Sequence, residues 1–294
     1  MEVGVPGEGG EPPASRHGAG HAAKWLLAAA ATAPAYLLAQ VLATLVAGIA
    51  LLTTNVDTLM SAATLAGLAL AVLWWLHLRP RALLRQEGAR PSCPARVALL
   101  VCALLALGVA LQVAISCALT LALPLFPKLM SGYLELMELA GITDEVSLAT
   151  LVEVAVMAPA AEEALCRGAA LEFSLRAFCP AFCSAERPAP RSEVPAARFW
   201  AANVVQALLF GIMHLNIVQG VYAFALGLLL GWIVRRTGRL RAAVLLHMAV
   251  NASSMLMDVL DPLIGGALVP ALVMGALAAA VLTAVVARLT DGSA

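Results

Sequence analysis

Eight apolar runs, separated by short polar or charged segments, follow one another from residue 25 to near the end of the chain. Most of them approach or exceed the length of about 20 apolar residues that a helix needs to cross the hydrocarbon core of a bilayer. The pattern therefore predicts an all-α, polytopic membrane protein with about eight transmembrane helices, forming a single domain over residues 23–290. The predicted spans are residues 25–52, 59–78, 97–126, 148–177, 199–215, 218–234, 242–257 and 263–287.

Residues 1–22 differ from the rest of the chain because they lack apolar periodicity and are rich in Gly, Pro and Ala. Such a segment cannot bury enough apolar surface to offset the entropy lost on ordering. We therefore expect a disordered N-terminal tail.

The composition agrees with a membrane protein. The chain has 294 residues, of which 62% are hydrophobic and 12% are charged, and its mean hydropathy is +0.91. These values lie outside the range of soluble globular proteins. The formal net charge of +0 argues against a nucleic-acid partner, which would require a basic surface. The expected partner is instead membrane lipid.

Basic residues gather in the loops at residues 79–96, 176–198 and 235–241, whereas the loops between these are acidic or neutral. Cytoplasmic loops of membrane proteins carry an excess of Lys and Arg. The alternation predicts an integral, multi-pass protein with both termini in the cytoplasm.

The fourth predicted span contains Glu162, Glu163 and Arg167 within six residues. A charged side chain at the centre of a bilayer costs about 3 kcal/mol or more, so such groups usually have partners and a role. Glu163 and Arg167 are four residues apart and share a helix face, with the acid before the base, which favours an ion pair. Glu162 is rotated from Glu163 by about 100° around the helix, so its carboxylate is free for chemistry in a polar cavity.

Three polar side chains of later spans are further candidates: His214, His247 and Asn251. Phe210 is four residues before His214, so its ring could pack against the imidazole and fix it. His247 and Asn251 also share a helix face, so both side chains could contact one ligand atom. Each has a simpler interpretation. His214 could be a histidine at a helix end near water, and His247 and Asn251 could make a polar contact between helices that aids packing.

Taken together, three segments resemble a known family. Glu162–Arg167 (EEALCR), Phe210–His214 (FGIMH) and His247–Asn251 (HMAVN) resemble the EExxxR, FxxxH and HxxxN motifs of the CPBP family, the CAAX protease and bacteriocin-processing or Abi family, which includes the type II CAAX prenyl endopeptidases. The similar region covers about residues 151–253. One difference is Cys166, because an aromatic residue often precedes the motif arginine.

The resemblance implies an intramembrane endopeptidase that hydrolyses a peptide bond of a membrane-associated peptide or lipidated protein, whether or not it is prenylated. Glu162 and His214 would activate water. Glu163 would be held by Arg167, and His247 and Asn251 would donate hydrogen bonds to the developing oxyanion. Because His214 falls near the far end of a regular fifth helix, we expect a tilted helix or a mid-bilayer cavity reached by a funnel from the cytoplasm.

Metal dependence and two rival functions stay open at this point. Two histidines and a glutamate are a common zinc ligand set, but the sequence lacks His-Glu-x-x-His and Arg167 adds positive charge, so we expect no cofactor, with zinc as the alternative. A non-catalytic membrane scaffold or bacteriocin-immunity protein would keep the same polar residues to join helices. A proton-coupled transporter would use the glutamates as a relay, but the sequence shows no inverted repeat.

Overall fold

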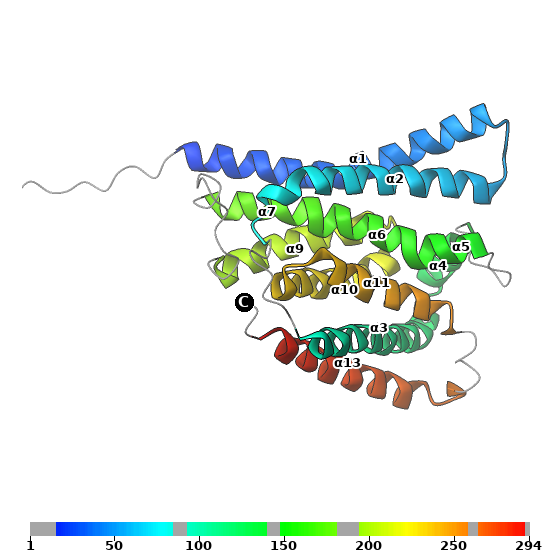
Figure 1. Ribbon diagram of the computed structural model, residues 1–294. Helices are drawn as coiled ribbons and strands as arrows, with labels where there is room; N and C mark the ends of the chain where they lie inside the picture. The colour runs from blue at the N-terminus through cyan, green and yellow to red at the C-terminus, as the bar shows by residue number, and fades with distance from the viewer. Residues whose placement is uncertain (1–15, 85–92, 140–147, 181–193, 258–263, 292–294) are drawn as a thin grey trace, which may run out of the picture.

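The computed structural model describes residues 16–84, 93–139, 148–180, 194–257 and 264–291, and its helices form a bundle (Figure 1). Within these ranges the chain forms helices and no strand. The prediction of an all-α protein is confirmed.

Each predicted span corresponds to a helix. The first three are α1 (Arg16–Ala50), α2 (Val56–Leu78) and α3 (Pro94–Ala122). The fourth is a continuous helical segment made of α5 (Leu148–Val152), η3 (Glu153–Met157), α6 (Ala158–Glu163), η4 (Ala164–Ala170) and α7 (Leu171–Phe178). The last four are α9 (Ala196–Ile212), α10 (Ile217–Thr237), α11 (Leu240–Ser254) and α13 (Leu268–Thr290). Besides these, α4 (Pro127–Leu139) and the short 3₁₀ turns η1 (Arg79–Arg81) and η2 (Leu123–Leu125) lie between spans.

Five of the described helices are long and apolar enough to cross a membrane: α1, α2, α3, α10 and α13. This confirms a protein with several membrane-crossing helices, whereas the number of eight stays a prediction. Helices α9 and α11 have only 17 and 15 residues, and the segment from α5 to α7 carries the charged motif.

The first helix begins earlier than its apolar run. It starts at Arg16, within the segment that we expected to be a disordered tail, and residues 1–15 of that segment lie outside the described residues. Helix α1 begins and α13 ends on the same side of the bundle (Figure 1).

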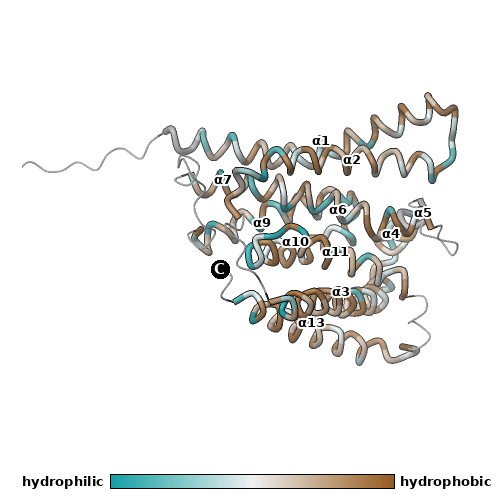
Figure 2. The backbone as a smooth tube through the Cα atoms, in the orientation of Figure 1, coloured by the Kyte–Doolittle hydropathy of each residue, from teal (hydrophilic) through white to brown (hydrophobic). Residues whose placement is uncertain are grey.

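The surface of the bundle is apolar. Side chains such as Leu45, Ile49 and Met274 are more than half exposed, with Ile49 at 75%. Hydrophobic residues follow each other along α3 and α13, and hydrophilic ones are frequent where helices end (Figure 2). Exposed apolar surface on this scale is typical of helices that face lipid.

Local signals in the sequence explain where α10 begins and ends. The side chain of Asn216 accepts hydrogen bonds from the backbone N–H groups of Val218 and Gln219, as an N-cap residue does. At the other end Gly238 adopts a left-handed conformation with φ of 64°, and its N–H donates to the carbonyl of Val234. The next helix, α11, therefore starts two residues later and returns alongside α3.

Small residues let the helices that carry the motifs approach closely. A Cβ atom added to Gly108 of α3 would lie 2.4 Å from Cβ of Ala249 of α11. A Cβ atom added to Gly231 of α10 would lie 1.8 Å from the side-chain oxygen of Asn203 of α9. Close backbone approach through small residues is how membrane helices gain packing energy in lipid.

Candidate active site

The EEALCR motif lies where the fourth helical segment departs twice from α-helical geometry. π-Helical turns precede and follow α6, and the second, η4, contains Arg167. Single π-turns inside α-helices occur frequently at functional sites. They change the direction of the side chains that follow, so a regular helix predicts the contacts of this segment only in part.

A buried network of three side chains is the centre of the site. Oε1 of Glu163 lies 2.8 Å from Nη1 of Arg167 and 2.9 Å from Nδ1 of His247. The Glu163 side chain has no exposed surface, and those of Arg167 and His247 are buried as well. The pair expected between Glu163 and Arg167 is therefore formed, and it extends to a histidine of α11.

The hydrogen bond to Glu163 orients His247. A carboxylate oxygen accepts, so Nδ1 of His247 carries the hydrogen. The other ring nitrogen, Nε2, lies 3.7 Å from Oε2 of Glu162. This distance is longer than a hydrogen bond, and it places the Glu162 carboxylate and the imidazole side by side.

The ring of Phe210 joins the two histidine motifs. It makes edge-to-face contacts with His214, at 5.0 Å between ring centroids, and with His247, at 5.6 Å. The guanidinium carbon of Arg167 lies 4.4 Å from the centroid of the same ring, which is a cation–π geometry. The expected contact of Phe210 with His214 is present, and the same ring brings His214 next to the network.

His214 is fixed by a backbone contact. Its Nδ1 lies 2.8 Å from the carbonyl oxygen of Phe210. A carbonyl oxygen only accepts, so Nδ1 donates, and the Nε2 of a neutral His214 is left as an acceptor. This tautomer is the one that a proton-accepting histidine requires.

Asn251 has a partner that the sequence did not indicate. Its Nδ2 donates to the carbonyl of Val154 at 2.9 Å. In the π-turn η3 the N–H of Ala158 donates to the carbonyl of Glu153, and Pro159 has no N–H to offer to Val154. Asn251 therefore satisfies a carbonyl that this irregular turn exposes, and one of its two amide hydrogens is used in doing so.

Burial divides the six candidate residues into two groups. Glu163, Arg167 and His247 are buried, whereas Glu162, His214 and Asn251 are only partly buried. The side chain of Glu162 is 17% exposed. The buried residues can fix the positions of the side chains around them, and the partly buried residues can contact a substrate.

Two tyrosines near Glu162 were missed by the sequence analysis. Tyr36 of α1 and Tyr222 of α10 both lie within electrostatic range of Glu162. Tyr36 is almost fully buried against α2. The available signal was a polar side chain within an apolar run. The tyrosines were missed because neither falls in one of the three motifs.

Two further glutamates flank the motif on the same helical segment. Glu153 and Glu172 lie near the two ends of this segment, and both are buried. Glu172 accepts hydrogen bonds from the backbone N–H of Leu83 at 2.9 Å and from Nε of Arg176 at 2.7 Å. Glu153 accepts a hydrogen bond from the hydroxyl of Ser61. Partners from neighbouring segments make this burial tolerable.

A comparison with known families gives a match over this region. Residues 144–253 match the family described as type II CAAX prenyl endopeptidase Rce1-like. The predicted resemblance to the CAAX protease family is confirmed. The matched range contains all six candidate residues and ends before α13, and residues 1–143 lie outside it. No curated protein and no solved structure matches the chain.

The donor groups of the site are already engaged with one another. Among the described residues, no three His, Cys, Asp or Glu side chains converge on one point that a metal could occupy. Glu163 and Nδ1 of His247 are already bonded to each other, and Arg167 brings a positive charge to the same carboxylate.

Proposed function

We propose that this integral membrane protein is an intramembrane endopeptidase that hydrolyses a peptide bond in a membrane-associated peptide or lipidated protein. The observation that carries the proposal is the partly exposed Glu162 carboxylate beside the buried network of Glu163, Arg167 and His247. The Rce1-like match over the same residues supports a peptidase.

In this reaction Glu162 and Nε2 of His214 activate the attacking water, and Glu162 accepts its proton. General bases of this kind typically contribute about 10²–10⁴ to the rate. The proton then passes to the departing amine, which completes hydrolysis.

His247 stabilises the oxyanion when its Nε2 carries a proton. With Nδ1–H already donated to Glu163, this His247 is an imidazolium, and the Glu163 carboxylate is its counter-charge. Arg167 holds that carboxylate in place. Asn251 contributes the amide hydrogen that Val154 does not use. Donors held in advance by buried partners need no reorganisation during the reaction.

We propose that the reaction needs no metal. Arg167 supplies positive charge where a zinc ion would sit, so exhaustive chelation of the purified protein should leave the cleavage rate unchanged. Recovery of a lost activity by added zinc would show instead that zinc is required.

For the membrane arrangement we propose eight crossings, with both termini in the cytoplasm and the site reached from that side and laterally from lipid. Loop charge supports this orientation. The common side of the start of α1 and the end of α13 supports an even number of crossings (Figure 1).

The proposal is tested with Glu162→Gln, assayed on a fluorogenic peptide presented in prenylated and unprenylated forms. We expect the cleavage rate to fall by about 10²–10⁴ with an unchanged thermal unfolding temperature. Glu135→Gln in α4 is the matched control, because Glu135 is exposed. Normal turnover by a stable Glu162→Gln protein would refute the enzyme and favour a non-catalytic scaffold or immunity protein.

A further inference from the structure

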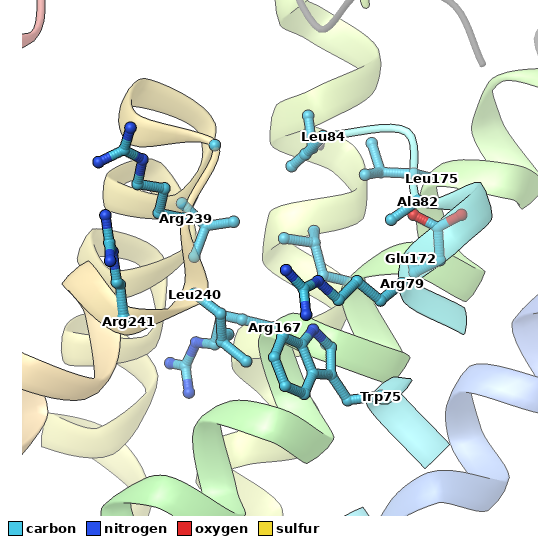
Figure 3. Close-up of a pocket in the computed structure, with 14 residues that line it drawn as sticks. Trp75, Arg79, Ala82, Leu84, Arg167, Glu172, Leu175, Arg239, Leu240 and Arg241 are labelled. Carbon is cyan, nitrogen blue, oxygen red and sulfur yellow. The ribbon is translucent and has the colours of Figure 1, made fainter. Parts of the chain in front are cut away.

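A cavity lies at the end of the bundle where the basic loops gather. Its volume is about 400 Å³, which is within the range of small-molecule sites. Trp75 and Arg79 lie on one side of it, and Arg239 and Arg241, from the start of α11, lie on the other (Figure 3). Arg167 also lines it.

The lining is strongly basic. Four arginines and one glutamate contribute to it. The glutamate, Glu172, already accepts hydrogen bonds from Leu83 and Arg176, so it does not neutralise the cavity. A site with this excess of positive charge favours an anion.

Arg167 has a buried guanidinium behind the wall of the cavity, because its side chain has no exposed surface. Its Nη1 is bonded to Glu163, but Nε and Nη2 are buried and have no hydrogen-bond partner among the described residues. A buried guanidinium with unsatisfied N–H groups is costly. The planar fork of these groups matches the oxygen atoms of a phosphate or a carboxylate.

We propose that this cavity binds a phosphate group, either from the headgroup of an anionic phospholipid or from free phosphate. Basic pockets between helices on the cytoplasmic side recognise such headgroups. Trp75, which stacks with Arg79 at 5.2 Å from ring centroid to guanidinium carbon, belongs to a residue type enriched at the membrane interface. The positive charge of four arginines also exceeds the single negative charge of a peptide carboxylate.

The bound phosphate has a consequence for the neighbouring site. The Arg167 side chain has no exposed surface and lies behind the cavity wall, so a bound phosphate would place a negative charge next to the arginine that holds Glu163 and favour its position there. The binding itself does not depend on peptidase activity and is measured without substrate.

The first experiment compares thermal unfolding of the purified protein in detergent with inorganic phosphate and with chloride at equal ionic strength. Phosphate at about tenfold its dissociation constant should raise Tm by about 2–4 °C. The double variant Arg79→Gln/Arg241→Gln should lose most of this rise. Arg288→Gln is the control, because Arg288 is an exposed arginine at the end of α13 that does not line the cavity.

The second experiment separates the sources of the phosphate. Nanodiscs of phosphatidylglycerol are compared with nanodiscs of phosphatidylcholine. A rise in Tm with phosphatidylglycerol that the double variant loses assigns the cavity to lipid, and a rise with inorganic phosphate alone assigns it to a soluble phosphate. Equal responses to phosphate and chloride, equal losses in the Arg288→Gln control, or stabilisation only by a peptide with a free carboxylate would overturn the proposal.

Discussion

At the scale of single residues, the Glu163 carboxylate depends on two partners of different kinds. Arg167 comes from the same helical segment and His247 from α11. Removing one partner of a buried ion pair typically costs about 3–5 kcal/mol, because the remaining charge stays buried. We therefore expect the arginine to support the fold as well as the proposed reaction.

We expect Arg167→Ala to lower Tm by about 10 °C and to reduce activity. The measurement is thermal unfolding in detergent, followed by the cleavage assay. Arg176→Ala is the matched control: Arg176 pairs with Glu172 at the same spacing but is 15% exposed, and Glu172 keeps the N–H of Leu83. An Arg167→Ala protein as stable as wild type would show that the arginine serves only substrate or transition-state binding.

The residue scale also shows what a sequence can and cannot specify. The pair of Glu163 and Arg167 was predicted because four residues form one helical turn. The bond between His247 and Glu163 joins residues 84 positions apart, and no local spacing encodes it. The bond of Asn251 to Val154 depends on a π-turn, which periodicity does not reveal.

At the scale of helices, the position of α11 is decided by its contact with α3. A Cβ atom on Gly108 would lie 2.4 Å from Cβ of Ala249, 2.9 Å from its carbonyl carbon and 3.0 Å from the backbone nitrogen of Val250. Two of these atoms are backbone, so a change of rotamer cannot relieve the clash. Ala249 lies midway between His247 and Asn251 in the sequence, so a shift of α11 here moves both side chains.

We therefore expect Gly108→Ala to destabilise the protein by about 1–3 kcal/mol and to reduce the cleavage rate more than the change in stability explains. Unfolding temperature and rate are measured on the same preparation. Gly132→Ala in α4 is the control, because a Cβ atom there meets no atom within 4 Å. Full activity of Gly108→Ala would mean that α11 can move without disturbing His247.

Helix boundaries were predictable where the sequence carries a local signal. Asn216 and Gly238 mark the ends of α10, and the apolar runs gave the other helices within several residues. The start of α1 at Arg16 was not predicted, because the Gly- and Ala-rich residues before Lys24 show no apolar periodicity.

At the scale of the whole molecule, membrane crossings follow from length and charge together. Each of the five apolar helices is long enough, and carries few enough charges, to cross a membrane by itself. The segment from α5 to α7 has the length but carries the charges of the site, and α9 and α11 are short. These three elements bear the three motifs, so the same residues that make the site polar weaken the signal for a span.

The orientation of the bundle gives the last prediction. Cys93 precedes α3 in a basic loop and is exposed, and Ser131 in α4 is exposed in a loop region without arginine. With the other cysteines replaced, a membrane-impermeant thiol reagent should label Cys93 only from the cytoplasmic side. The Ser131→Cys variant, with Cys93 also replaced, should be labelled only from outside, because an odd number of crossings separates the two positions. Labelling of both positions from one side would show that α3 does not cross the membrane. A reversed pattern would place the arginine-lined cavity and the termini on the outer face.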